Sequence, residues 1–117
     1  MTYVDGFVVA VPTANKAEYI KHAAEGAEVF KKYGALHVVE AWGDDVPDGE
    51  VTSFPMAVKC KPDETVCLAW IVWPSKAART EGMEKCIADP YFQGDPSGVP
   101  YDGKRMIFGS FETIVEL

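Results

Sequence analysis

Three residues near the C-terminal end have the spacing of a phosphate-binding loop. Gly98, Gly103 and Lys104 fit the pattern G-x-x-x-x-G-K within the stretch SGVPYDGKRM. Such a loop also needs Ser or Thr after the lysine to hold magnesium, with a strand before it and a helix behind it. Arg105 follows the lysine here, and Pro100 removes one of the donor amides. The stretch therefore predicts a turn before the final strand and no nucleotide site.

An acidic loop after the second predicted strand has part of the spacing of a calcium-binding EF-hand. Asp44, Asp48 and Gly49 occupy the first, fifth and sixth positions of that pattern. The third and twelfth positions are Val46 and Pro55, whose side chains carry no oxygen ligand, and no flanking helices are predicted. We therefore expect a solvated loop and no metal site.

The two histidines give no catalytic or metal-binding pattern. His37 and Glu40 form an H-x-x-E pair, which would gather two ligands on one face of a helix. They fall in a predicted strand, where residues three apart point to opposite faces, so no shared site is expected. His22 adjoins Lys21 on a predicted helix and is expected at the surface.

Three cysteines, Cys60, Cys67 and Cys86, occur without a C-x-x-C or zinc-binding pattern. We expect free thiols that pack as small apolar groups, as in a reducing compartment. No signal sequence or membrane-spanning segment is predicted, because the N-terminal apolar run Phe7–Val11 is short and follows no basic residue. The expected location is the cytoplasm.

Length and charge limit the classes of partner. The chain has 117 residues, 48% of them apolar and 25% charged, which suits one globular domain over residues 1–117. Its formal net charge is −7, and no basic run exceeds two residues. Basic surfaces are what bind nucleic acids and anionic membranes, so neither is expected as a partner.

Hydrophobic alternation and turn residues predict an α+β domain. Strands are expected at residues 3–11, 36–42, 54–61, 65–73 and 104–115, with an irregular segment at 89–102. One helix is expected between an N-cap at Asn15 and a stop at Gly34, and another from a cap at Ser75 to about Ala88. The expected inner residues of the second helix are Ala78, Met83, Cys86 and Ile87. With 54–61 as a short hairpin partner, this is the ferredoxin-like βαββαβ sandwich with an antiparallel sheet.

The predicted strands are apolar on both faces. Phe7 and Val9 point one way in the first strand while Val8 and Ala10 point the other, and residues 65–73 alternate in the same manner. Two helices cover one face of such a sheet, so the other needs a second cover. We expect a homodimer that packs sheet against sheet.

Five residues are candidates for ligand binding. Trp42 and Trp70 lie on predicted strands and Tyr91 and Tyr101 in the irregular segment, where their rings are expected to line a small pocket between sheet and helices. Arg105 is expected to hold an anionic or carbonyl group of the ligand. The alternative is that the rings pack only in the core or at the subunit interface. No residue is assigned as catalytic, and no cofactor is expected.

Several sequence blocks resemble the YbaA-like family of bacterial proteins. They are YVDGFVVAVP at 3–12, VPDGEVTSF at 46–54, PSKAAR at 74–79, ADP at 88–90 and DGKRMIFGSFE at 102–112. The resemblance implies the dimeric α+β barrel, in which the sheets of two ferredoxin-like copies pair. That superfamily includes cofactor-free monooxygenases, haem-degrading enzymes and lactone isomerases, whose ligands lie between sheet and helices. Their catalytic His or Asn-Trp-His sets have no counterpart here.

The leading hypothesis is therefore a cytoplasmic homodimer that binds a small organic molecule, of the cofactor-independent oxygenase or isomerase kind. The alternative is a non-catalytic structural or stress-related accessory dimer, and the sequence leaves the choice between enzyme and non-enzyme open. An open cavity with a charged group on its wall favours the first hypothesis, whereas a filled core favours the second.

Overall fold

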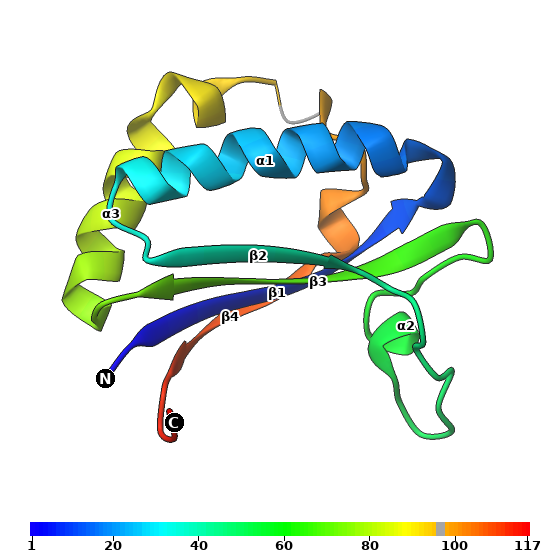
Figure 1. Ribbon diagram of the computed structural model, residues 1–117. Helices are drawn as coiled ribbons and strands as arrows, with labels where there is room; N and C mark the ends of the chain where they lie inside the picture. Colours follow the sequence, from blue (N-terminus) through cyan, green and yellow to red (C-terminus); the bar gives the residue numbers. More distant parts are fainter. Residues whose placement is uncertain (96–97) are drawn as a thin grey trace.

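Four strands form one antiparallel sheet in the order β2-β3-β1-β4. The computed structural model describes residues 1–95 and 98–117. The central strands are β1, Tyr3–Pro12, and β3, Glu64–Trp73; the edge strands are β2, His37–Trp42, and β4, Ile107–Glu112. β1 pairs with β3 from Tyr3–Trp73 to Pro12–Glu64. This is the ferredoxin-like order that the sequence predicted (Figure 1).

Two helices, α1, Lys16–Lys32, and α3, Lys76–Ala88, cover the same face of the sheet (Figure 1). Gly34 follows α1 with φ +111, which lets the chain turn into β2. The Ser75 hydroxyl accepts a hydrogen bond from the Ala78 amide at 3.1 Å and caps α3 as predicted. Among the described residues no helix is long and apolar enough to cross a membrane.

Asn15 is the residue before α1, as predicted, but its side chain makes no capping hydrogen bond. A 3-10 turn over Thr13–Asn15 precedes the helix, so Asn15 has φ −94 and ψ 13 rather than an extended cap conformation. Its side-chain Nδ2 instead donates to the Pro100 carbonyl at 3.2 Å. This contact ties the start of α1 to the segment that follows α3.

The core lies between the helices and the odd-numbered residues of β1 and β3. Val9, Val11, Cys67, Ile71 and Trp73 are almost completely buried there.

α3 packs on this core through a glycine. A Cβ atom on Gly82 would lie 2.5 Å from the Trp73 ring and 2.6 Å from the Tyr33 carbonyl oxygen. Cys86 is buried, as predicted, but Ile87 is exposed, because the helix turns Gly82 and Cys86 inward instead.

Two strand predictions need correction. Residues 54–61 do not form a strand: α2 occupies Phe54–Ala57, because Ser53 accepts from the Met56 amide and Pro55 suits a first helical turn. The last strand was expected at 104–115 but spans β4 alone, because a 3-10 turn over Gly103–Arg105 precedes it. The irregular segment 89–102 contains a 3-10 turn at Pro90–Gln93, and residues 96–97 of it lie outside the described residues.

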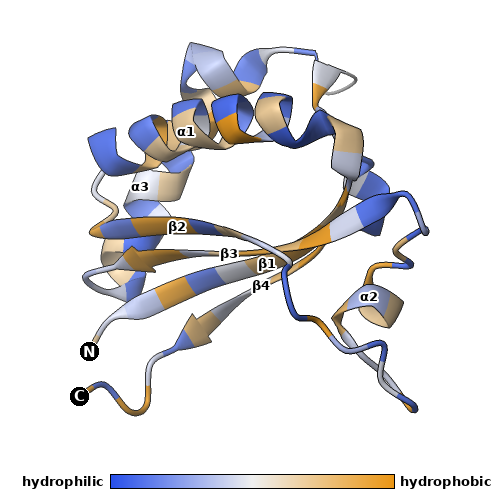
Figure 2. Cartoon of the chain, turned by 45° about the vertical axis from the view of Figure 1, so that its right-hand side comes forward, coloured by the Kyte–Doolittle hydropathy of each residue, from blue (hydrophilic) through white to orange (hydrophobic). Residues whose placement is uncertain are grey.

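The second face of the sheet has no helical layer beyond α2, which packs at one end (Figure 2). Its strand residues are apolar apart from His37 at the start of β2 and Glu64 at the start of β3, and Leu68, Ile107 and Phe111 are 39%, 44% and 60% exposed. We call this surface the open face; it is formed by Val4, Val8, Val39, Leu68, Trp70, Val72, Ile107 and Phe111.

Arg105 forms the most extensive side-chain ion pair of the described residues. Its Nη1 and Nη2 donate to the two carboxylate oxygens of Glu64 at 2.7 and 2.6 Å, and Nη1 also donates to the Lys59 carbonyl at 2.9 Å. Its Nε donates to Asp102 at 3.0 Å. The guanidinium thus joins the start of β3, the turn after α2 and the turn before β4.

Replacing Glu64 tests this junction. Glu64→Gln is expected to lower the free energy of unfolding by about 2 kcal/mol at neutral pH, because the guanidinium loses its charged partner. The hydrogen bonds from Arg105 lower the pKa of Glu64 from 4.5 to about 2. The ion pair therefore stabilises the fold above pH 4.5, and its contribution is lost as the pH falls toward 2.

Urea denaturation near neutral pH and at about pH 3 measures the effect. Glu84→Gln, at an exposed position of α3, is the control and should change stability little. If Glu64→Gln lowers the free energy of unfolding equally at both pH values, the charge of Glu64 does not stabilise the fold through Arg105.

Candidate functional site

A cavity of about 360 Å³ lies between α1 and the sheet. Its apolar wall includes Phe7, Phe30, Val38, Ile71 and Met83. Its polar wall includes Asp5, Tyr19, His22, Glu40, Arg79 and Tyr101. A neighbouring cavity of about 370 Å³ shares Tyr19, Ala23, Ala27, Val38 and Glu40 with it and extends to Trp42. We call the first of these the α1 cavity.

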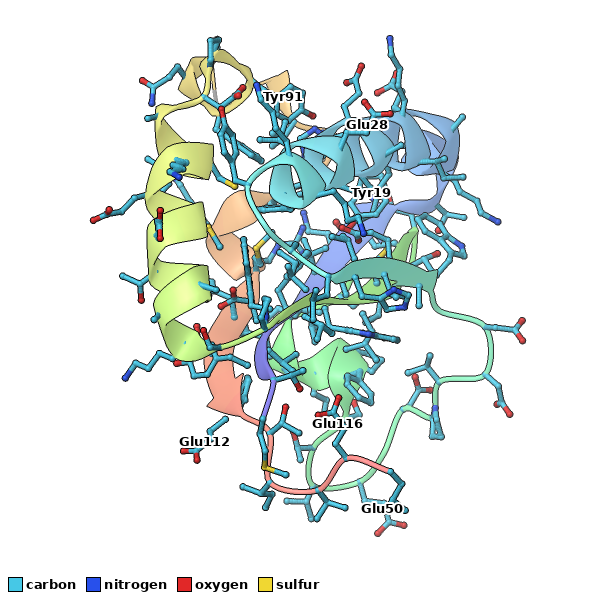
Figure 3. The ribbon with its side chains drawn as sticks, turned by 60° about the vertical axis from the view of Figure 1, so that its left-hand side comes forward. Tyr19, Glu28, Glu50, Tyr91, Glu112 and Glu116 are labelled. Atoms are coloured by element: carbon cyan, nitrogen blue, oxygen red, sulfur yellow. The ribbon has the colours of Figure 1, made fainter. Side chains whose placement is uncertain are left out.

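Tyr19 and Glu40 form a hydrogen-bonded pair on the wall of the α1 cavity. The Tyr19 hydroxyl donates to Glu40 Oε1 at 2.6 Å, and Tyr19 points from α1 toward the sheet (Figure 3). Burial raises the pKa of Glu40, and the hydrogen bond from Tyr19 offsets part of that rise. Burial, with the adjacent Glu40, also raises the pKa of Tyr19. Both shifts favour the protonated form of each group relative to the same group in water.

His37, three residues before Glu40, lies exposed on the opposite face of β2. The prediction that the two side chains of this H-x-x-E pair point to opposite faces of the strand is confirmed. In the described residues no group of three or more His, Cys, Asp or Glu side chains is arranged to hold a metal ion.

His22 is half-buried, so its predicted place at the surface is wrong. The segment after α3 crosses over α1 and brings Tyr91 and Tyr101 against the imidazole. The Tyr91 hydroxyl donates to the His22 carbonyl at 3.0 Å, and the Tyr101 hydroxyl lies 3.5 Å from Nε2. Burial lowers the pKa of His22, which favours the neutral ring.

Asp5 and Arg79 form a second polar group on the cavity wall. Asp5 is 8% exposed in the central strand β1 and accepts from Trp73 Nε1 at 2.9 Å and Arg79 Nε at 3.1 Å. The Ser110 hydroxyl donates to its other oxygen at 2.5 Å. Every oxygen of this buried carboxylate therefore has a donor.

The structure brings together three of the five residues expected to bind a ligand. Tyr101 lines the α1 cavity, Trp42 lines the neighbouring one, and Tyr91 contacts His22. Trp70 lies on the open face, away from the helices. Arg105 donates its hydrogen bonds to Glu64 and Asp102 and does not line the cavity. Ligand binding by any of the five stays a prediction.

Apart from Tyr101, sequence reasoning did not assign the polar residues of the cavity wall to a site. Asp5 and Glu40 each stand alone within an apolar strand, where a charged side chain is costly unless it is paired, and that was the available signal. Tyr19 falls within the predicted first helix, but its partner Glu40 is 21 residues away. No spacing rule links Arg79 to Asp5, 74 residues before it.

Removing the Tyr19 hydroxyl tests the electrostatics of the pair. Tyr19→Phe is expected to raise the pKa of Glu40 further, because the hydroxyl donates to the charged carboxylate and stabilises it. Carboxyl carbon NMR titration measures this pKa, with the Glu40 resonance assigned by its loss in Glu40→Gln. Tyr33→Phe is the control, since the Tyr33 hydroxyl donates to Asp89. A lower pKa of Glu40 in Tyr19→Phe would contradict the assignment.

Two solved structures share the fold at low sequence identity. SnoaB, a cofactor-independent oxygenase from Streptomyces nogalater, is 17% identical with a TM-score of 0.63 over 99% of this chain and 96% of that one. An uncharacterized NIPSNAP domain protein from Burkholderia xenovorans is 16% identical with a TM-score of 0.59 over 96% and 94%. The fold is thus the ferredoxin-like one, similar to dimeric α+β barrel structures.

Sequence similarity is much closer to one group of bacterial proteins. The chain is 50% identical over 116 residues to the uncharacterized protein YbaA of Escherichia coli strain K12 and to that of Shigella flexneri, with 99% of each chain covered. Residues 2–103 match the family described as protein of unknown function (DUF1428). The resemblance to YbaA-like proteins is confirmed, and the chain belongs to the DUF1428 family.

Proposed function

We propose that this protein is a cytoplasmic homodimer that binds a small organic molecule in the α1 cavity of each subunit and moves a proton on it through Glu40. The observation that carries the proposal is the Tyr19–Glu40 pair on the wall of a cavity of about 360 Å³. This volume suits a small ligand. In a purely structural dimer a close-packed core would be more stable than an open one. An open cavity with charged groups on its wall therefore favours the ligand-binding hypothesis.

Glu40 has the properties of a general base. Its raised pKa makes its carboxylate a stronger proton acceptor than an exposed one. Tyr19 occupies Oε1, and among the described residues Oε2 has no hydrogen-bond partner. In the proposed reaction Oε2 accepts a proton from an acidic C–H or O–H of the ligand, which becomes an enolate or phenolate. Return of the proton to a different carbon is an isomerisation.

The fold supports the same class of chemistry by analogy. SnoaB is a cofactor-independent oxygenase, and its chain superposes on nearly all of this one. An enolate or phenolate is electron-rich enough to react with dioxygen, so base-generated anions serve oxygenases as well as isomerases. Because identity is 17%, this likeness supports the proposal only through the shared fold.

The open face supports the dimer. A largely helix-free sheet surface with Leu68, Ile107 and Phe111 partly exposed is costly in water, and similarity to dimeric α+β barrel structures favours a second sheet as its cover. Trp70 lies on this face and is proposed to pack in the interface. The three free thiols agree with a reducing cytoplasm.

Charging the open face tests the dimer. The unmodified protein is expected to have twice the chain mass by light scattering, and Trp70→Arg is expected to have the monomer mass, because an unpaired guanidinium cannot be buried between two sheets. Ile87→Arg adds the same charge at an exposed position of α3, 62% exposed, and should stay dimeric. A monomeric unmodified protein, or a dimeric Trp70→Arg, would overturn this part of the proposal.

Proton exchange tests the chemistry. The bicyclic ketone 2-tetralone carries acidic α-protons, and the protein in D₂O is expected to speed their exchange, as seen by NMR. Glu40→Gln is expected to slow the catalysed exchange about 100-fold or more. Glu28→Gln is the matched control, because Glu28 points away from the sheet on α1 (Figure 3). Equal rates in both variants would exclude Glu40 as the base.

A further inference from the structure

The two arginines of this protein are both partly buried, but they differ in how many of their nitrogens donate to protein acceptors. All three nitrogens of the Arg105 side chain donate to protein acceptors: Glu64, Asp102 and the Lys59 carbonyl. The Arg79 side chain donates through Nε to Asp5, and among the described residues it has no other acceptor. Its two terminal nitrogens, which form the planar fork of the guanidinium, are therefore unpaired. Arg79 also lines the α1 cavity, whereas Arg105 does not.

Asp5 holds the Arg79 guanidinium in a defined position. Trp73 Nε1 and Ser110 Oγ donate to the carboxylate from β3 and β4, so Asp5 is fixed before Arg79 binds to it. Asp5 occupies the Nε of the guanidinium and leaves the fork free. An arginine fork matches the two oxygens of a carboxylate and binds them through two parallel hydrogen bonds.

The register places Asp5, which holds the Arg79 guanidinium, at a distance from Glu40. Asp5 and Val38 both pair with Ile71, so β3 separates β1 from β2, and Glu40 lies two residues beyond Val38. With strands about 4.8 Å apart and residues about 3.4 Å apart, the Cα atoms of Asp5 and Glu40 are roughly 12 Å apart. The wall between them is apolar and includes Phe7 and Ile71.

We propose that Arg79 is the head-group site of the α1 cavity and binds the carboxylate of the ligand, with the acidic C–H or O–H of the same molecule at Glu40. The inference rests on the proposed function and narrows its substrate class. The ligand is an aromatic or alicyclic carboxylic acid with an enolisable or phenolic group at the end opposite the carboxylate.

Two naphthalene probes test this assignment. 6-Hydroxy-2-naphthoate has a phenol and a carboxylate at opposite ends, and 2-naphthol has the phenol alone. Calorimetric titration is done with the unmodified protein, Arg79→Gln, Arg79→Lys and the control Lys76→Gln. The control removes a positive charge from an exposed position of the same helix that does not line the cavity. Circular dichroism verifies that each variant is folded, and Arg79→Lys retains the charge next to Asp5.

The hydroxy acid is expected to bind the unmodified protein at least about tenfold more tightly than 2-naphthol. Arg79→Gln is expected to remove that preference, Arg79→Lys to keep part of it, and Lys76→Gln to keep it fully. Equal affinity of the two probes, or a preference that survives in Arg79→Gln, would overturn the head-group site and leave the proposed function standing. Failure of both probes to bind the unmodified protein would count against the proposed function itself, and against this site with it.

Discussion

The arrangement of the cavity depends on a single buried carboxylate, that of Asp5. A carboxylate in the central strand of a sheet is stable only if both oxygens are hydrogen-bonded. Its three donors come from Trp73 at the end of β3, Arg79 on α3 and Ser110 on β4. One side chain thus joins the two central strands to an edge strand and to a helix. These elements cannot shift independently, so this wall of the cavity is formed before any ligand binds.

The two faces of the sheet carry different kinds of side chain. The face under the helices mixes apolar residues with Asp5, Glu40 and the donors that satisfy them. The open face is apolar in its central strands and carries Trp70 and Leu68 there. Polar groups that are paired yet reach a cavity suit recognition of a small molecule, whereas an uninterrupted apolar surface suits another protein surface. The proposed division between ligand site and subunit interface follows from this difference.

The fold was predictable because local and long-range signals agreed. Alternating strands, glycine after the first helix and serine before the second gave the element order without knowledge of contacts. The strand expected at 54–61 was wrong because Ser53 and Pro55, a helix-start pair, outweighed a short apolar run. The sequence could not assign Arg105 to Glu64 or Arg79 to Asp5, since those pairs join residues 41 and 74 positions apart. Which arginine already has all its acceptors within the protein depends on these long-range pairs, and residue spacing contains no such information.

The missing side chain at Gly82 has a consequence for which substitutions α3 can accept. The backbone of α3 at Gly82 lies directly against the Trp73 ring and the Tyr33 carbonyl. This leaves no room for a larger residue at position 82 or for the helix to move closer to the sheet. A larger side chain at position 82 would therefore push α3 away from Trp73 and Tyr33 and loosen the packing on this side of the core.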